Sequence, residues 1–169
     1  ILIIDMTPAN LGIACCPAIN LDECLKKDNI NMISCGGQAS IPICVALKSS
    51  NSNLSYIEVV STISSVSTGV GTRINISEYI TATENAITNF TGIKNVKVII
   101  NISPALPPVT MKTTIFVESK EIINFQDTVE KIRLMSNKTK EYVKGFRNII
   151  TLKRIGERTL SQIEVSGSG

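Results

Sequence analysis

Residues 34–42 read Ser-Cys-Gly-Gly-Gln-Ala-Ser-Ile-Pro, and they join a short apolar segment to a longer one. The preceding segment, residues 31–34, is predicted to be a strand, and a helix is predicted over much of residues 37–48. The apolar positions of that helix run almost all round its axis, which is typical of a buried helix. Pro42 is harmless in the first turn of a helix and produces a kink if the helix starts earlier.

Strands interspersed with helices are predicted on both sides of this junction. The predicted strands cover residues 1–5, 31–34, 56–64, 96–102, 112–118, 148–154 and 159–165, and the predicted helices cover 37–48, 76–90 and 125–143. The first strand is expected to be buried and residues 96–102 to be central, because both are largely apolar. Residues 6–30 and 65–73 are expected to be irregular. Asn75 with Glu78 is a capping signal for helix 76–90, and Gly92 marks its end.

This order predicts an α+β fold with a mixed β-sheet and helices packed on one face. The other face of such a sheet would be free for a partner subunit. The length of 169 residues and a hydrophobic content of 43% suit a single domain over residues 1–169. An apolar strand at residue 1, without Met, suggests a piece of a longer protein.

Composition argues against several classes of protein. The net charge of +3 comes from scattered residues and aromatics make up only 4%, so nucleic-acid binding is not expected. No apolar run reaches the roughly 18 residues that a membrane helix needs. Without a secretory signal, a cytoplasmic protein with free thiols is expected.

The chain contains five cysteines and no histidine. The absence of histidine removes Cys–His and Ser–His catalysis from this chain, and no C-x-x-C pair is present to form a zinc site, so no metal site is expected. Cys44 is expected in the core, Cys15 and Cys16 in a loop before Pro17, and Cys24 at the surface.

Cys35 is the candidate nucleophile. It leaves a strand and enters a helix, where unpaired N–H groups stabilise a thiolate without histidine. The backbone N–H groups of Gly36 and Gly37 could hold an oxyanion, so the turn suits attack on an aldehyde or acyl group. A buried structural cysteine beside a glycine turn is the alternative that the residue types leave open.

A second candidate site is the segment Gly-Val-Gly-Thr-Arg at residues 69–73. A G-x-G loop before a helix lets the backbone approach an anion or a planar ring. It is not the G-x-G-x-x-G fingerprint, because position 74 is Ile. An ordinary turn capped by Asn75 is the alternative.

Residues 34–42 resemble the nucleophile segment of bacterial acylating acetaldehyde dehydrogenases, which reads T-C-G-G-Q-A-T-I-P. The resemblance extends over most of the chain and includes residues 4–9, 56–60, 72–76 and 104–108. It becomes loose over roughly the last 20 residues. The second domain of this family is similar to that of glyceraldehyde-phosphate dehydrogenase, which implies the same kind of catalytic and dimerisation domain here.

The resemblance implies a reaction and a set of site residues. The Cys35 thiolate would attack acetaldehyde, hydride would pass to NAD, and coenzyme A would take the acetyl group from the sulfur. Gly36 and Gly37 would contact the oxyanion. The segment expected to contact NAD comprises Ser67, Thr68, Gly69, Val70, Gly71, Thr72, Arg73, Ile74 and Asn75. A homodimer is implied, as are a 4-hydroxy-2-oxoacid aldolase partner and a place in the catabolism of aromatic hydrocarbons.

The chain departs from the family at several points. The family's N-terminal Rossmann domain and its C-terminal G-N-L-D segment are absent from this sequence. Thr113 stands where the family has an acidic residue, Ser103 where it has Asn, and Val70 where it has Pro. The isolated chain is therefore expected to be inactive. The alternatives are a non-catalytic dimerisation module and an acyltransferase that works without NAD.

Overall fold

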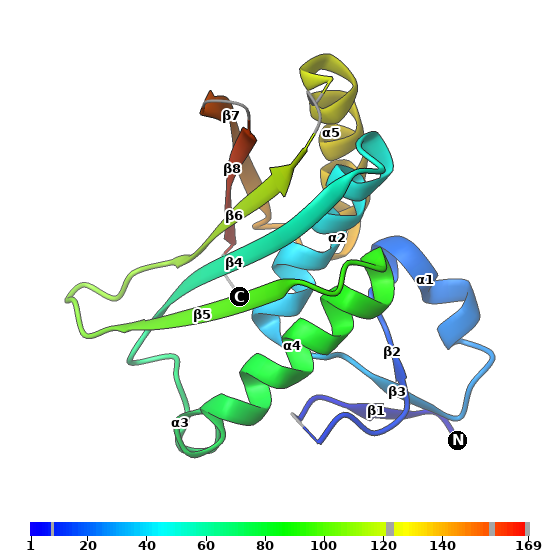
Figure 1. Cartoon of the computed structure of the whole chain (residues 1–169). Helices are drawn as coiled ribbons and strands as arrows, with labels where there is room; N and C mark the ends of the chain where they lie inside the picture. Colours follow the sequence, from blue (N-terminus) through cyan, green and yellow to red (C-terminus); the bar gives the residue numbers. More distant parts are fainter. Residues whose placement is uncertain (8, 121–123, 156–157, 168–169) are drawn as a thin grey trace.

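The computed structural model describes residues 1–7, 9–120, 124–155 and 158–167. The described strands are β1 (Ile3–Asp5), β2 (Ile13–Ala14), β3 (Asn29–Asn31), β4 (Leu54–Ser64), β5 (Val96–Ser103), β6 (Met111–Ser119), β7 (Arg147–Ile155) and β8 (Arg158–Gly167). The described helices are α1 (Pro17–Cys24), α2 (Cys35–Ser50), α3 (Val70–Ile74), α4 (Ile76–Thr91) and α5 (Phe125–Tyr142). The strands form a three-stranded sheet in the order β1-β3-β2 and a five-stranded sheet in the order β5-β4-β6-β8-β7 (Figure 1).

The five-stranded sheet is mixed, because β4 pairs in parallel with β5 and antiparallel with β6. Alternate residues of β4 and β6 are buried, among them Ile57, Val59, Ile115 and Val117. This period of two places one face of each strand against the helices. Helix α2 packs between α4 and α5 and against the strands, so the helices share one face (Figure 1). The predicted α+β fold is confirmed.

Helix α2 lies at the centre of the core. Its side chains Ile41, Ile43 and Leu47 are all but inaccessible to solvent and belong to one cluster with residues of the sheet. Burying each such side chain stabilises the fold by about 1.5–3 kcal/mol. The helix begins at Cys35, so Pro42 lies well inside it and leaves one backbone carbonyl of the preceding turn without its usual donor.

The N-terminal region differs from the prediction. Residues 6–30 are not irregular, because they contain β2 and the short helix α1, with Pro17 in its first turn. The strand expected at 31–34 lies at 29–31. Cys24 is buried, not exposed, because the apolar side of α1 turns it toward the carbonyl of Ala14.

Two strands are less enclosed than their apolar sequences suggest. Strand β1 pairs only with β3, and Ile3 and Ile4 remain 57% and 54% exposed. Residues 96–102 were expected at the centre of the sheet, but β5 lies at its edge. Its apolar residues are explained by packing against α4 on one face, where Val98 is buried.

The segment before α4 also differs from the expected loop, because Val70–Ile74 form the short helix α3. The side chain of Asn75 does not cap α4; it donates a hydrogen bond of 2.9 Å to the carbonyl of Gly71. The predicted helix end at Gly92 is confirmed, with Gly92 in the left-handed region at φ 73°.

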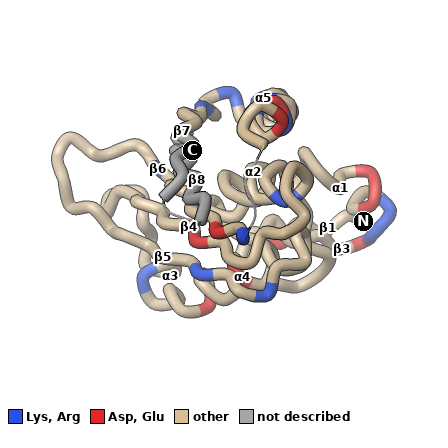
Figure 2. Tube along the Cα trace, turned by 45° about the horizontal axis from the view of Figure 1, so that its top comes forward, with Lys and Arg blue, Asp and Glu red and all other residues tan. Residues whose placement is uncertain are grey.

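Charges are dispersed over this framework. Figure 2 shows the basic residues of the described chain on several elements, with acidic residues among them. None of the described helices combines the length and apolar character needed to cross a bilayer.

Candidate active site around Cys35

Cys35 is the first residue of α2 and its thiol is exposed, whereas the other four cysteines are buried. Ser34 caps the helix, because its Oγ accepts a hydrogen bond of 2.9 Å from the N–H of Gly37. The same Oγ lies 2.8 Å from the hydroxyl of Thr83 on α4. The predicted position of Cys35 at a strand-to-helix junction is confirmed.

Burial makes three of the other thiols harder to ionise. Desolvation raises the pKa of Cys15 and of Cys16 to about 12, and it also raises the pKa of Cys44. These groups therefore remain protonated and inaccessible near neutral pH. Cys35 is the thiol that a reagent or substrate can reach in this structure.

The turn before Cys35 has an unusual backbone. Ile33 is buried and adopts φ 64°, a left-handed conformation that costs a β-branched residue roughly 1–3 kcal/mol. The side chain of Asn31 holds this turn, because its Oδ1 accepts a hydrogen bond of 2.7 Å from the N–H of Ile33. Asn31 also donates to Asp5, at 2.9 Å. No residue pattern in the sequence predicts this turn geometry.

Tyr79 on α4 is the closest functional group to the candidate nucleophile. Its hydroxyl lies 3.3 Å from the sulfur of Cys35 and accepts a hydrogen bond of 2.8 Å from the N–H of Gly36. Burial, reinforced by the neighbouring thiol, raises the pKa of Tyr79 above its ordinary value. From the sequence, Tyr79 is only one position of the predicted helix 76–90.

Gly36 and Gly37 are required by close packing. A Cβ atom at Gly36 would lie 2.6 Å from the hydroxyl oxygen of Tyr79, and one at Gly37 would lie 2.9 Å from Ile33. Both amides already have partners, Tyr79 and Ser34 respectively. The expected contact of these amides with an oxyanion stays a prediction, and it requires a substrate oxygen to share or replace these partners.

A cavity of about 490 Å³ opens beside Cys35 and Tyr79. Its wall includes Ser67, Thr68 and Thr72 from the segment expected to contact a cofactor. The other lining residues come from β4, β6 and the connections that follow β4 and precede β6: Ile63, Ser64, Val66, Pro108, Val109, Thr110 and Met111. The fold thus brings the two sequence segments together around one cavity.

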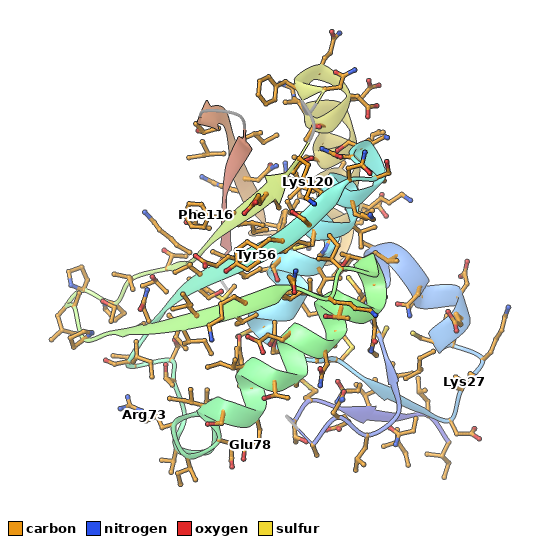
Figure 3. The ribbon with its side chains drawn as sticks, in the orientation of Figure 1. Lys27, Tyr56, Arg73, Glu78, Phe116 and Lys120 are labelled. Atoms are coloured by element: carbon orange, nitrogen blue, oxygen red, sulfur yellow. The ribbon has the colours of Figure 1, made fainter. Side chains whose placement is uncertain are left out.

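The rest of the expected cofactor segment lies outside that lining. Gly69, Val70, Gly71, Ile74 and Asn75 belong to the turn and short helix that carry Thr72. Arg73 folds back onto the same segment, because its guanidinium donates to the carbonyls of Thr68 and Ser65 at 3.1 and 2.6 Å. In Figure 3, Arg73 and Glu78 lie near α3 and the start of α4. Arg73 therefore stabilises the loop that precedes α3 in this structure.

Thr113 occupies the sheet position at which the resembled family has an acid. It is buried, faces Ser61 across the β4–β6 ladder, and lies 2.9 Å from it between hydroxyl oxygens. A Cβ atom at Gly36 would lie 3.4 Å from the hydroxyl oxygen of Ser61, so this hydroxyl pair is close to the first turn of α2. The environment on this side of Cys35 is polar and uncharged.

The fold and site define an α+β domain with one accessible thiol at a helix start, beside a cavity. Residues 35–169 match the family model described as prokaryotic acetaldehyde dehydrogenase, dimerisation. The chain therefore belongs to the family of prokaryotic acetaldehyde dehydrogenase dimerisation domains.

Proteins named acetaldehyde dehydrogenase are similar over nearly the whole chain. The protein of Burkholderia thailandensis is 44% identical over 168 residues, covering 99% of this chain and 56% of the relative. That of Pectobacterium atrosepticum is 42% identical over 169 residues, with coverages of 99% and 57%. Acetaldehyde dehydrogenase 2 of Salinispora arenicola is 34% identical over 166 residues, with coverages of 98% and 56%. The chain spans a little over half the length of these relatives.

Proposed function

We propose that this chain is the catalytic and dimerisation part of an NAD-dependent acylating acetaldehyde dehydrogenase, with Cys35 carrying the acetyl group. One observation carries the proposal: the only thiol exposed among the described residues starts a buried helix and lines a cavity with Ser67, Thr68 and Thr72. The names of the relatives indicate the substrate, and the site supplies a group able to react with it.

The proposed chemistry starts at the sulfur of Cys35. The thiolate adds to the carbonyl carbon of acetaldehyde, forming a C–S bond while the carbonyl electron pair moves to oxygen. When that C=O bond re-forms, the C–H bond breaks and hydride leaves with its electron pair, so the product on Cys35 is an acetyl thioester. The thiolate of coenzyme A then attacks the thioester carbon, and the C–S bond to Cys35 breaks with its electron pair returning to sulfur.

The described residues fit a nicotinamide cofactor at this cavity. NAD, when bound, would accept the hydride. Ser67, Thr68 and Thr72 offer hydroxyl and backbone groups, and none of the described lining residues has a cationic side chain. An uncharged group such as a carboxamide or an aldehyde suits such walls better than a diphosphate does. We therefore propose that these three residues contact the nicotinamide end of the cofactor.

A non-catalytic dimerisation module is the second candidate function. The observation that favours it is the Ser61–Thr113 hydroxyl pair, which places no acid or base beside the first turn of α2. The two candidates differ in the reactivity expected of Cys35, because a module has no need of a reactive thiol.

Replacing Cys35 in the full-length protein tests the proposal. Wild-type protein given acetaldehyde, NAD and coenzyme A should form NADH and acetyl-CoA, and Cys35→Ser should lower the rate at least about a thousandfold, as for loss of a nucleophile. Cys44→Ala is the matched control, because it removes a thiol from the same helix in the core and not from the cavity. Activity retained by Cys35→Ser would refute the proposal.

A further inference from the structure

We propose that the Tyr79 hydroxyl is a catalytic group that stabilises the Cys35 thiolate, connecting the sulfur to the first-turn amide of helix α2. The inference rests on the proposed function, because it assigns a partner to the same nucleophile. This chain has no histidine and has Thr113 in place of an acid. The Cys35 thiolate therefore needs a different stabilising group.

The direction of the contact with Gly36 is fixed, and that of the contact with Cys35 follows once the sulfur is a thiolate, which can only accept. The N–H of Gly36 can only donate, so the Tyr79 oxygen is the acceptor of the 2.8 Å hydrogen bond between them. The single hydroxyl proton of Tyr79 is then free to point at the sulfur, 3.3 Å away. Accepting from an amide at a helix start polarises the hydroxyl and strengthens its donation to a charged acceptor.

Tyr79 acts as a donor throughout and not as a base. Burial raises its pKa, so it keeps its proton near neutral pH. When the S–H bond of Cys35 breaks, the electron pair stays on sulfur and the proton passes to water, which reaches the exposed side chain. The same hydroxyl then stabilises the sulfur again when coenzyme A displaces it from the acetyl thioester.

Neighbouring contacts hold the hydroxyl in place. One turn along α4, the Thr83 hydroxyl lies 2.8 Å from the helix cap Ser34 and donates to the carbonyl of Tyr79 at 2.7 Å. Among the described residues that line the cavity, Tyr79 and Cys35 are the ionisable ones.

Substitution of Tyr79 by Phe removes the hydroxyl and keeps the ring. In the full-length protein, the rate of iodoacetamide labelling at Cys35 should fall about tenfold near pH 7 and approach the wild-type rate in alkali, as expected for losing one hydrogen bond to a charged group. Tyr142→Phe is the control, because Tyr142 is an exposed residue of α5 and lies outside the cavity lining. Its labelling profile should match the wild type.

Substitution of Gly36 by Ala displaces the same hydroxyl from the opposite side, because the new Cβ would lie 2.6 Å from it. Gly36→Ala should therefore slow labelling about as much as Tyr79→Phe. In the double variant that clash is absent, so Gly36→Ala should add little to the effect of Tyr79→Phe. Fast labelling of the buried cysteines would show that Tyr79→Phe has unfolded. The labelling rate of Gly36→Ala would then be the test of the Tyr79 role.

The outcomes separate this inference from the proposed function. Uniformly slow labelling of all thiols in the wild type would contradict both. Selective labelling of Cys35 with profiles that coincide in wild type, Tyr79→Phe and Gly36→Ala would overturn the role of Tyr79 and leave the proposed function standing.

Discussion

The left-handed residue Ile33 directs the chain from β3 into α2 and thereby sets the position of Cys35. Its conformation is unfavourable, so it depends on neighbouring contacts, of which the hydrogen bond to Asn31 is the most direct. Such a turn is invisible in the sequence, since Ile is a residue that avoids positive φ. The same holds for Tyr79, whose function depends on a contact 44 residues away in the chain.

Asn31→Ala tests the support of this turn. Asn31 is fully buried, and its loss leaves the N–H of Ile33 without its acceptor. The free energy of unfolding should fall by about 1–3 kcal/mol, as measured by chemical denaturation of the full-length protein. Asn85→Ala, at an exposed position of α4, is the control. Equal denaturation midpoints for the two variants would contradict the role of Asn31 in stabilising this turn.

The carboxyl group of Asp5, close to the same turn, is expected to make the stability of the fold depend on pH. Hydrogen bonds from Thr7 and Leu11, with a smaller one from Asn31, lower its pKa from 3.8 to about 2. The unfolded chain therefore binds this proton more readily, so the stabilisation is present above about pH 4 and is lost as the pH falls toward 2. The amide shifts of Thr7 and Leu11 should titrate with a midpoint near 2. Asp5→Asn should abolish that titration, and a midpoint near 4 would contradict it.

The longer helices and strands could be predicted from the sequence, whereas the short elements β2, α1 and α3 could not. Helices α4 and α5 and strands β4 and β6 carry regular apolar spacing, and their predicted bounds are close to those of the structure. Helix α1 is eight residues long and kinked at Asn20, so it is too short to show a regular apolar stripe in the sequence. Strand β5 resembled a central strand because α4 covers one of its faces, and sequence does not reveal which strand ends a sheet.

Ser34→Ala tests how α2 and α4 are joined. The variant removes the helix cap and the contact with Thr83, so stability should fall by about 0.5–2 kcal/mol for the cap alone. Thermal unfolding of Ser34→Ala beside Ser77→Ala, an exposed serine of α4, measures the effect. No difference between the two would show that the cap does not stabilise this junction.

At the scale of the whole molecule, the sheet face opposite the helices carries half-buried side chains that include Tyr56, Val60 and Phe116. Figure 3 shows Tyr56 and Phe116 on the same face of the sheet. The family model is a dimerisation domain and spans all five strands of this sheet. We propose that a second copy of the chain covers this face.

Phe116→Glu tests the proposed dimer face. It places a second carboxylate opposite Glu58 in the β4–β6 ladder, where a partner would bury both. Sedimentation of the full-length protein should show a shift from dimer toward monomer. Leu134→Glu, at an exposed position of α5, should leave the dimer intact. A stable dimer of Phe116→Glu would contradict this choice of face.

The proposed function requires the Cys35 sulfur to carry the acetyl group during turnover. The full-length protein should be supplied with acetaldehyde and NAD, without coenzyme A, followed by rapid acid quench and peptide mass spectrometry. We expect one acetyl group on Cys35 that disappears, with formation of acetyl-CoA, when coenzyme A is added. Acetylation of a different residue, or NADH formation without any acyl group on Cys35, would contradict it.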